Sequence, residues 1–181
     1  MSGGGTGGAL GGAGSGGGGA GGSGGSAGGG AEDYDMQPED FGCISELQRV
    51  RGYRIKNMLG HDTEAVAAAE NDEGAVFPVG TVIQHLPNEA MVKRRAGFSA
   101  ETKDWEFFVL TLSAQGTTIA QRGTTDVETS MGATCVSCHT DVPDQYDFIC
   151  NTWGDSGDGT CGFNLSDMQL MQQEASDPRC D

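Results

Sequence analysis

The middle of the chain alternates between apolar and polar residues with a period of two, which is typical of a β-strand whose two faces differ. Residues 81–86 (TVIQHL) place Ile83 and His85 on one face. Pro87 and Asn88 then favour a turn, and residues 89–94 return as a second strand. The pattern predicts a β-hairpin with His85 at the end of its first strand.

A second hairpin is predicted directly after the first. Residues 105–112 (WEFFVLTL) form the most apolar strand pattern in the chain, and residues 117–122 follow it across an Ala-Gln-Gly turn. We interpret the aromatic residues of this strand as core. Two consecutive hairpins favour an antiparallel sheet.

Helical patterns are short. An Ala-rich helix is expected to start at a cap provided by Asp62 or Thr63. Three further elements are expected: a short helix over 38–48, a strand with a kink at Gly52 over 49–56, and a helix over 126–139. The sequence thus predicts an α+β fold, a predominantly antiparallel β-sheet with a few short helices, the helix that carries the Cys-His motif lying late in the chain.

Composition divides the chain into two regions. Residues 1–30 are almost entirely Gly with Ser, Ala and Thr, and contain no charge. Such a stretch cannot bury enough apolar surface to offset the entropy of ordering, so we expect a disordered Gly/Ser-rich tether. Residues 31–181 are long enough for a single domain, and we expect this domain to end in an acidic tail that contains a disulfide.

The net charge of the chain limits the kinds of macromolecule that it can bind. The formal net charge is −16 with His neutral, and all charged residues lie after the glycine-rich region. So acidic a domain is poorly suited to nucleic acid or to anionic membranes. A partner protein, if there is one, is expected to be basic.

The strongest chemical signal is Cys135-Val136-Ser137-Cys138-His139. This C-x-x-C-H pattern is the attachment signature of haem c: Cys135 and Cys138 form thioethers to the haem vinyl groups, and His139 ligates the iron. Three other interpretations compete, namely a thioredoxin-like redox pair, half of a zinc site, and ordinary disulfide cysteines. A redox pair normally follows a strand in a βαβ unit, and the sequence has no second C-x-x-C or H-x-x-x-H to complete a zinc site.

Four cysteines remain, and they allow three pairings. We favour Cys150–Cys161, which closes a short Gly/Asp-rich loop, and then Cys43–Cys180 by elimination. Haem attachment and disulfides both favour a periplasmic or extracellular location. No signal peptide is visible before the glycine-rich region, so we expect that an N-terminal segment is missing from this sequence, and we leave open that this segment tethers the chain to a membrane.

The order of these segments resembles the cytochrome P-460 family, small β-rich mono-haem c-type cytochromes with relatives called cytochrome c′-beta. The matching segments are the FPVGTV run at 77–82, the EAMVK run at 89–93, the aromatic strand from Trp105, and the motif at 135–139. The resemblance covers roughly residues 50–148. It implies one covalent haem c, held by Cys135, Cys138 and His139, and leaves a homodimer open.

The resemblance also indicates a departure on the other side of the iron. In members of the family that oxidise hydroxylamine, a lysine cross-links to the haem edge, and the position aligned with it here is His85. Glu89 aligns with a carboxylate of the distal pocket. The missing lysine leaves open whether the chain is a haem-dependent oxidoreductase.

From the residues alone, His85 and Glu89 flank a tight turn and should lie close together. His85 could ligate iron or relay a proton, and Glu89 could accept protons from a substrate. The alternatives are a packed or surface histidine and an exposed turn carboxylate. Lys93-Arg94-Arg95 is interpreted as a solvated run, with neutralisation of haem propionates as the alternative.

The function expected at this stage is redox or small-ligand chemistry at an open distal haem site, with hydroxylamine or nitric oxide as the ligand. Two alternatives stay open: an electron-transfer cytochrome with a sixth protein ligand (His85, Met91 or Met131) and its redox partner protein, and a disulfide-stapled binding domain without haem.

Overall fold

The computed structural model describes residues 32–129, 132–150, 170–171 and 175–180, all within the compact unit Ala31–Asp181. The predicted tether at 1–30 lies outside the described residues.

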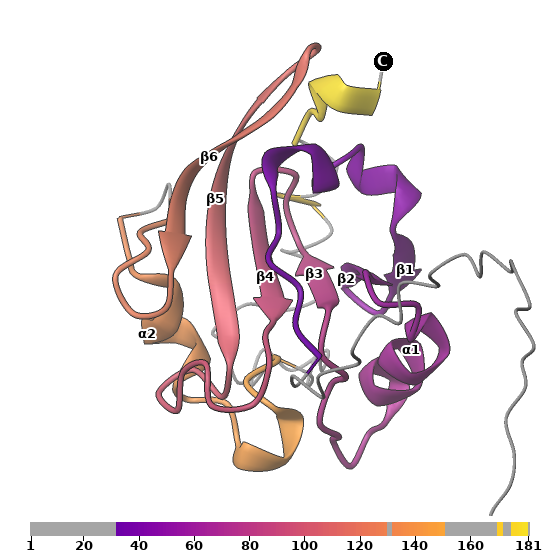
Figure 1. The fold of residues 1–181 in the computed structure, drawn as a ribbon, viewed down its shortest axis with the longest axis vertical. Helices are drawn as coiled ribbons and strands as arrows, with labels where there is room; N and C mark the ends of the chain where they lie inside the picture. The colour runs from indigo at the N-terminus through magenta and orange to yellow at the C-terminus, as the bar shows by residue number, and fades with distance from the viewer. Residues whose placement is uncertain (1–31, 130–131, 151–169, 172–174, 181) are drawn as a thin grey trace, which may run out of the picture. The chain divides into compact units, whose positions relative to one another are not determined.

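Six strands form one antiparallel sheet in the order β1-β2-β3-β4-β5-β6, which confirms the predicted fold class (Figure 1). The strands are β1 Gln48–Val50, β2 Tyr53–Asn57, β3 Thr81–Gln84, β4 Glu89–Lys93, β5 Trp105–Ser113 and β6 Gly116–Gly123. The α-helices are α1 Asp62–Glu70 and α2 Cys135–His139, and the 3-10 turns are η1 Pro38–Asp40, η2 Ile44–Glu46, η3 Asp144–Tyr146 and η4 Pro178–Cys180.

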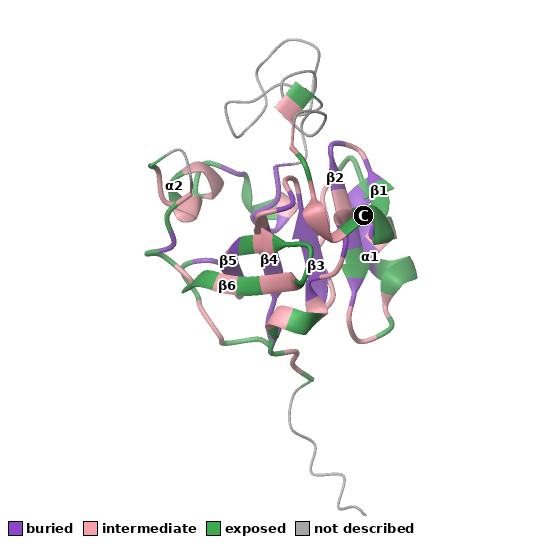
Figure 2. Cartoon of the chain, turned by 90° about the horizontal axis from the view of Figure 1, so that it is seen from above, coloured by how far each residue is buried: buried purple, intermediate pink, exposed green. Residues whose placement is uncertain are grey.

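The two faces of the sheet bury two separate apolar clusters. One face, which we call the motif face, carries Tyr53, Ile83, Met91 and Phe107 and packs against the alanines of α1 and against Cys135 of α2. The opposite face packs against the N-terminal segment, which crosses in front of the central strands in Figure 1. Figure 2 shows that burial is concentrated in these central strands, whereas the edge strand β6 and α2 are partly exposed. The predicted alternation is confirmed within β3, where Ile83 and Val82 pack on opposite faces, but the strand ends at Gln84 rather than at Leu86.

The N-terminal helix predicted over 38–48 is absent from the structure, which instead has the two 3-10 turns η1 and η2. Gly42 lies between the two turns, and Cys43 is committed to a disulfide. Phe41 and Leu47, which the prediction placed on one helical face, are nevertheless buried against the sheet. The disulfide and the packing against the sheet, both made with distant segments, therefore decided the conformation of this segment in place of its local helical pattern.

The strand predicted over 49–56 is also corrected, because it is a hairpin of β1 and β2. Val50 pairs with Tyr53, and Arg51 adopts a φ of 51° in the turn. The expected kink at Gly52 is thus a complete reversal of the chain. In α1, the cap position is occupied by His61 rather than by Asp62 or Thr63. The Asp62 carboxylate instead accepts the backbone N–H of Asn57 at 2.7 Å, and so ties the helix start to β2.

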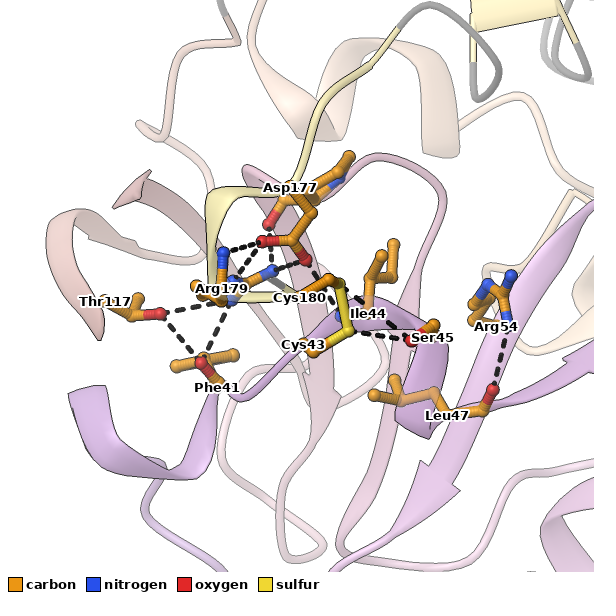
Figure 3. Close-up of a disulfide and its surroundings, with 11 residues drawn as sticks. Phe41, Cys43, Ile44, Ser45, Leu47, Arg54, Thr117, Asp177, Arg179 and Cys180 are labelled. Atoms are coloured by element: carbon orange, nitrogen blue, oxygen red, sulfur yellow. Dashed lines mark hydrogen bonds and ion pairs between the residues drawn. A yellow bond between two sulfur atoms is a disulfide. The ribbon is translucent and has the colours of Figure 1, made fainter. Parts of the chain in front are cut away.

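A disulfide joins the two ends of the domain. Cys43 and Cys180 are bonded, as the favoured pairing predicted, and the surrounding contacts are shown in Figure 3. The Asp177 carboxylate accepts the backbone N–H of Ile44 at 2.9 Å, and Arg179 Nη1 donates to the Phe41 carbonyl at 3.0 Å. Cys150 is also disulfide-bonded, but its predicted partner Cys161 lies outside the described residues.

The helix predicted over 126–139 is much shorter than expected, since α2 begins only at Cys135. Thr134 is extended and forms a β-bridge with Glu128, and Gly132 adopts a φ of 78° between them. This bridge is incompatible with a continuous helix. The bridge ends directly before the single helical turn Cys135–His139 and places this turn beside the sheet. Within the described residues, no helix is long and apolar enough to cross a membrane.

Candidate functional site

The single turn of α2 places both motif thiols beside the motif face. The backbone N–H of Cys135 donates to the carbonyl of Val127 at 2.9 Å, and Cys135 and Val136 pack against the buried cluster of that face. Cys135 and Cys138 are half-buried, and neither is disulfide-bonded. The two thiols are thus held on one helical turn, which is the arrangement that two thioether bonds to one haem require.

His139 is held by one hydrogen bond and two aromatic rings. Its Nδ1 lies 2.7 Å from the Phe148 carbonyl oxygen. Because a carbonyl only accepts, Nδ1 must carry the proton, and Nε2 remains the nitrogen available to a metal. The imidazole is stacked on Phe148 with a centroid distance of 5.7 Å and tilted against Phe107 at 5.3 Å. Burial lowers the pKa of His139, so the ring is neutral at pH 7, the form that ligates iron.

The environment of Cys135 is unfavourable to thiolate chemistry. Burial, followed by the charge of the Glu89 carboxylate, raises the pKa of the Cys135 thiol to about 12. A redox-active or nucleophilic cysteine needs the opposite shift, which stabilises the thiolate. The thioredoxin-like interpretation of the motif therefore has no support from the electrostatics of this thiol.

His85 and Glu89 lie at the two ends of the β3–β4 connection. In the β3–β4 pairing Val82 faces Val92 and Ile83 faces Met91, but β3 ends at Gln84, so His85 lies in the connection and Glu89 begins β4. That the two side chains lie close together stays a prediction. Both are half-buried rather than exposed. Their charges are coupled to the motif: Glu89 raises the pKa of Cys135, and His139 contributes to lowering that of His85. Both residues therefore lie on the motif face.

His85 is a half-buried, neutral imidazole. Its Nδ1 lies 3.3 Å from the carbonyl of Gly52, and its ring packs edge-on against Tyr53. Burial lowers the pKa of His85 to about 4, and the hydrogen bond to Gly52 only partly offsets this effect. The interpretation of His85 as a solvent-exposed residue is therefore excluded, and its role as a ligand or proton relay remains a prediction.

Sequence reasoning missed Tyr53. The residue is fully buried, and its hydroxyl has no hydrogen-bond partner among the described residues. Burial raises the pKa of this hydroxyl, so it stays protonated. Tyr53 reads in the sequence as an ordinary strand residue, and only the β2–β3 register, which pairs Arg54 with Gln84, brings it next to His85.

The basic run Lys93-Arg94-Arg95 is not a solvated surface run, contrary to the expectation. Lys93 and Arg94 are 6% and 7% exposed, and only Arg95 is open to solvent. Lys93 pairs with Asp147 at 2.7 Å, whereas Arg94, on the opposite face, pairs with Asp33 at 3.0 Å and with Glu106. Each buried cation already has acidic partners from distant segments, so neither is a free charge for a haem propionate.

The residues of the motif face fit a covalently attached haem. Two unpaired thiols share a helical turn with an imidazole whose Nδ1 is engaged and whose Nε2 is available. A zinc site finds no comparable donor set in the described part of the chain, where the one cluster of three metal-type donors is Cys43, Asp177 and Cys180, two of which form a disulfide. Of the predicted sixth ligands, Met91 is buried on the motif face, and Met131 lies outside the described residues.

No family model, curated protein or solved structure matches the chain. The resemblance to the cytochrome P-460 family therefore stays a prediction from the motif residues and the order of the segments in this sequence.

Proposed function

We propose that the domain attaches one haem c through Cys135 and Cys138, with His139 as the axial ligand of the iron. The observation that carries this proposal is the hydrogen bond from His139 Nδ1 to the Phe148 carbonyl, because it leaves Nε2 for a metal beside two unpaired thiols. When bound, a haem c supplies one-electron chemistry and a site for small ligands at its iron.

The proposed activity is redox or small-ligand chemistry, with hydroxylamine or nitric oxide as the ligand. The polar groups that support it are the Tyr53 hydroxyl, the neutral His85 imidazole and the Glu89 carboxyl, all on the face against which α2 packs. Tyr53 can donate a hydrogen bond to a polar ligand, and Glu89 can accept protons from a nitrogen substrate. The cross-linking lysine of hydroxylamine-oxidising relatives has no counterpart at His85, so oxidation would proceed without that bond.

Electron transfer is the second candidate, and the neutral state of His85 favours it. A neutral imidazole on the same face as His139 is a competent sixth ligand. The two candidates differ in a single measurement. An open site binds carbon monoxide after reduction and changes its absorption spectrum, whereas a six-coordinate carrier keeps a low-spin spectrum that carbon monoxide does not alter.

The disulfides support a location outside the cytoplasm. The Cys43–Cys180 bond and the disulfide of Cys150 would both be exposed to reduction in a cytosol. We therefore propose a periplasmic or extracellular domain. A redox partner would need a basic docking surface, because the chain carries a net charge of −16.

The deciding experiment is maturation of the chain in a host that exports proteins and attaches haem c, followed by a pyridine haemochrome spectrum. One covalent haem per chain is expected. The matched control is Cys135→Ser/Cys138→Ser, which keeps the fold and both disulfides but should carry no covalent haem. If the wild-type chain folds with its disulfides formed and binds no haem, the proposal is wrong, and the disulfide-stapled binding domain becomes the better description.

A further inference from the structure

The carbonyl that holds His139 belongs to an unusual turn. Residues 146–149 reverse the chain, and the Ile149 backbone N–H donates to the Tyr146 carbonyl at 2.9 Å. Asp147 and Phe148, the two central residues, adopt φ values of 50° and 73°. Positive φ at both positions is the mark of a type I′ turn, which normally uses Asn and Gly. A phenylalanine in this conformation is strained, and such strain persists only where the surroundings impose it.

The contacts that impose the strained conformation are hydrogen bonds to Asp147. Lys93 Nζ lies 2.7 Å and 2.8 Å from the two carboxylate oxygens, and the backbone N–H of Phe77 donates to Oδ2 at 2.9 Å. Trp105 Nε1 donates to the Asp147 carbonyl at 2.7 Å. The turn is therefore clamped from β4, from β5 and from the loop before β3.

The central clamp is an ion pair removed from solvent. The side chains of Lys93 and Asp147 are only 7% and 5% exposed. The third hydrogen of the Lys93 ammonium is donated to the carbonyl of Lys103 at 2.7 Å, so the cation is fully satisfied. A buried pair of this kind contributes little net stability compared with apolar residues of the same size. Its distinctive contribution is geometric, since it holds a specific backbone conformation.

The conformation of the turn places the Phe148 carbonyl oxygen where it accepts the hydrogen bond of His139. The strained Phe148 offers its carbonyl to Nδ1 at 2.7 Å and its ring to the imidazole as a stacking surface, at an interplanar angle of 22°. A hydrogen bond accepted from Nδ1–H makes the imidazole a stronger donor at Nε2 and fixes the rotation of the ring. The Lys93–Asp147 ion pair is thus connected to the His139 imidazole through the backbone of a single turn.

We propose that Lys93 and Asp147 are positioning residues for the axial ligand: their buried ion pair holds the strained 146–149 turn that orients His139 and sets its basicity. The inference rests on the proposed haem function and assigns a role to two residues outside the motif. Both residues act through the backbone of the turn.

The test uses the haem-loaded protein and the variants Asp147→Asn and Lys93→Met/Asp147→Asn. Asparagine tolerates positive φ at position 147, and only the double variant also leaves no unpaired buried charge. We expect unchanged haem content, an iron–histidine stretching band at lower frequency in the reduced protein, and a raised reduction potential. Arg95→Met is the matched control, because it removes one positive charge two residues away at an exposed position and should change neither quantity.

The outcomes separate this inference from the proposed function. A wild-type chain without haem overturns both. A wild-type chain that carries haem, with both Asp147 variants matching Arg95→Met in band position and potential, overturns the inference alone. If neither Asp147 variant folds, Lys93→Arg keeps the charge pair but changes its geometry, and a band that does not move in that variant overturns the inference as well.

Discussion

The rings of Tyr53 and His85 pack edge to face, with centroids 5.5 Å apart and an interplanar angle of 83°. His85 directs Nδ1 to the carbonyl of Gly52, whereas the fully buried Tyr53 hydroxyl has no hydrogen-bond partner among the described residues. A buried hydroxyl without a partner costs about 1–3 kcal/mol, so its retention needs an explanation. A polar ligand at the motif face would supply the missing partner.

The first prediction concerns Tyr53→Phe. In the haem-free protein this change should leave the free energy of unfolding unchanged or raise it by about 1 kcal/mol, because the phenyl ring keeps the packing and the unpaired hydroxyl is removed. In the haem-loaded protein the affinity for a polar ligand such as nitric oxide should fall by about 2- to 10-fold, the equivalent of one hydrogen bond. Urea unfolding and ligand titration measure the two effects. A clear loss of stability would mean that the hydroxyl already has a partner inside the protein.

The second prediction concerns the coordination of the iron. With an open distal site, His85→Ala should leave the absorption spectrum of the oxidised haem protein unchanged, because His85 is then not an axial ligand. His61→Ala is the control, since His61 is a histidine whose side chain is 41% exposed. A shift from a low-spin to a high-spin spectrum in His85→Ala alone would instead establish His85 as the sixth ligand and favour electron transfer.

The third prediction is the pH dependence of Cys135 in the haem-free Cys138→Ser variant. Since burial raises the pKa of this thiol to about 12, the reactive thiolate is a minor species throughout the neutral range. The alkylation rate with iodoacetamide should rise about tenfold per pH unit from pH 7 to pH 10 without a plateau.

The same measurement tests the effect of the Glu89 charge on Cys135. Glu89→Gln removes a negative charge that opposes thiolate formation, so alkylation at a given pH should become faster. Glu101→Gln, at an exposed position, is the matched control. A plateau near pH 8 in the Cys138→Ser protein would contradict the burial of Cys135 and revive the redox-pair interpretation.

The fourth prediction concerns the Cys43–Cys180 disulfide. It closes a loop with a sequence separation of 137 residues, and its loss in Cys43→Ala/Cys180→Ala should lower the free energy of unfolding by about 2–5 kcal/mol. The haem-free Cys135→Ser/Cys138→Ser variant is the control and should change stability by less than about 1 kcal/mol. Denaturant unfolding without reductant keeps the disulfide of Cys150 intact, so the difference reports on this bond alone.

Local patterns determined the elements in which one face is consistently apolar. Residues 81–84 and 105–113 fold as strands because their alternating side chains pack into the apolar clusters on the two faces of the sheet. The C-x-x-C-H spacing needs only one helical turn to bring its side chains together. The pairing of β3 with β4 followed in the same way, since a short turn sets the register of its hairpin.

Only the tertiary structure decided the features that depend on distant partners. Lys93 and Asp147 are 54 residues apart, and Arg94 and Asp33 are 61 apart, so no local pattern could indicate that a basic run would be buried. A β-bridge between Glu128 and Thr134 replaces most of the helix expected over 126–139. Tyr53 lies next to His85 only because β2 pairs with β3. The sequence by itself determined the motif, the two consecutive hairpins and the antiparallel sheet, because these follow from spacing and periodicity. The folded chain decided which polar groups surround the motif, because burial and charge pairing are set by contacts between segments far apart in the sequence.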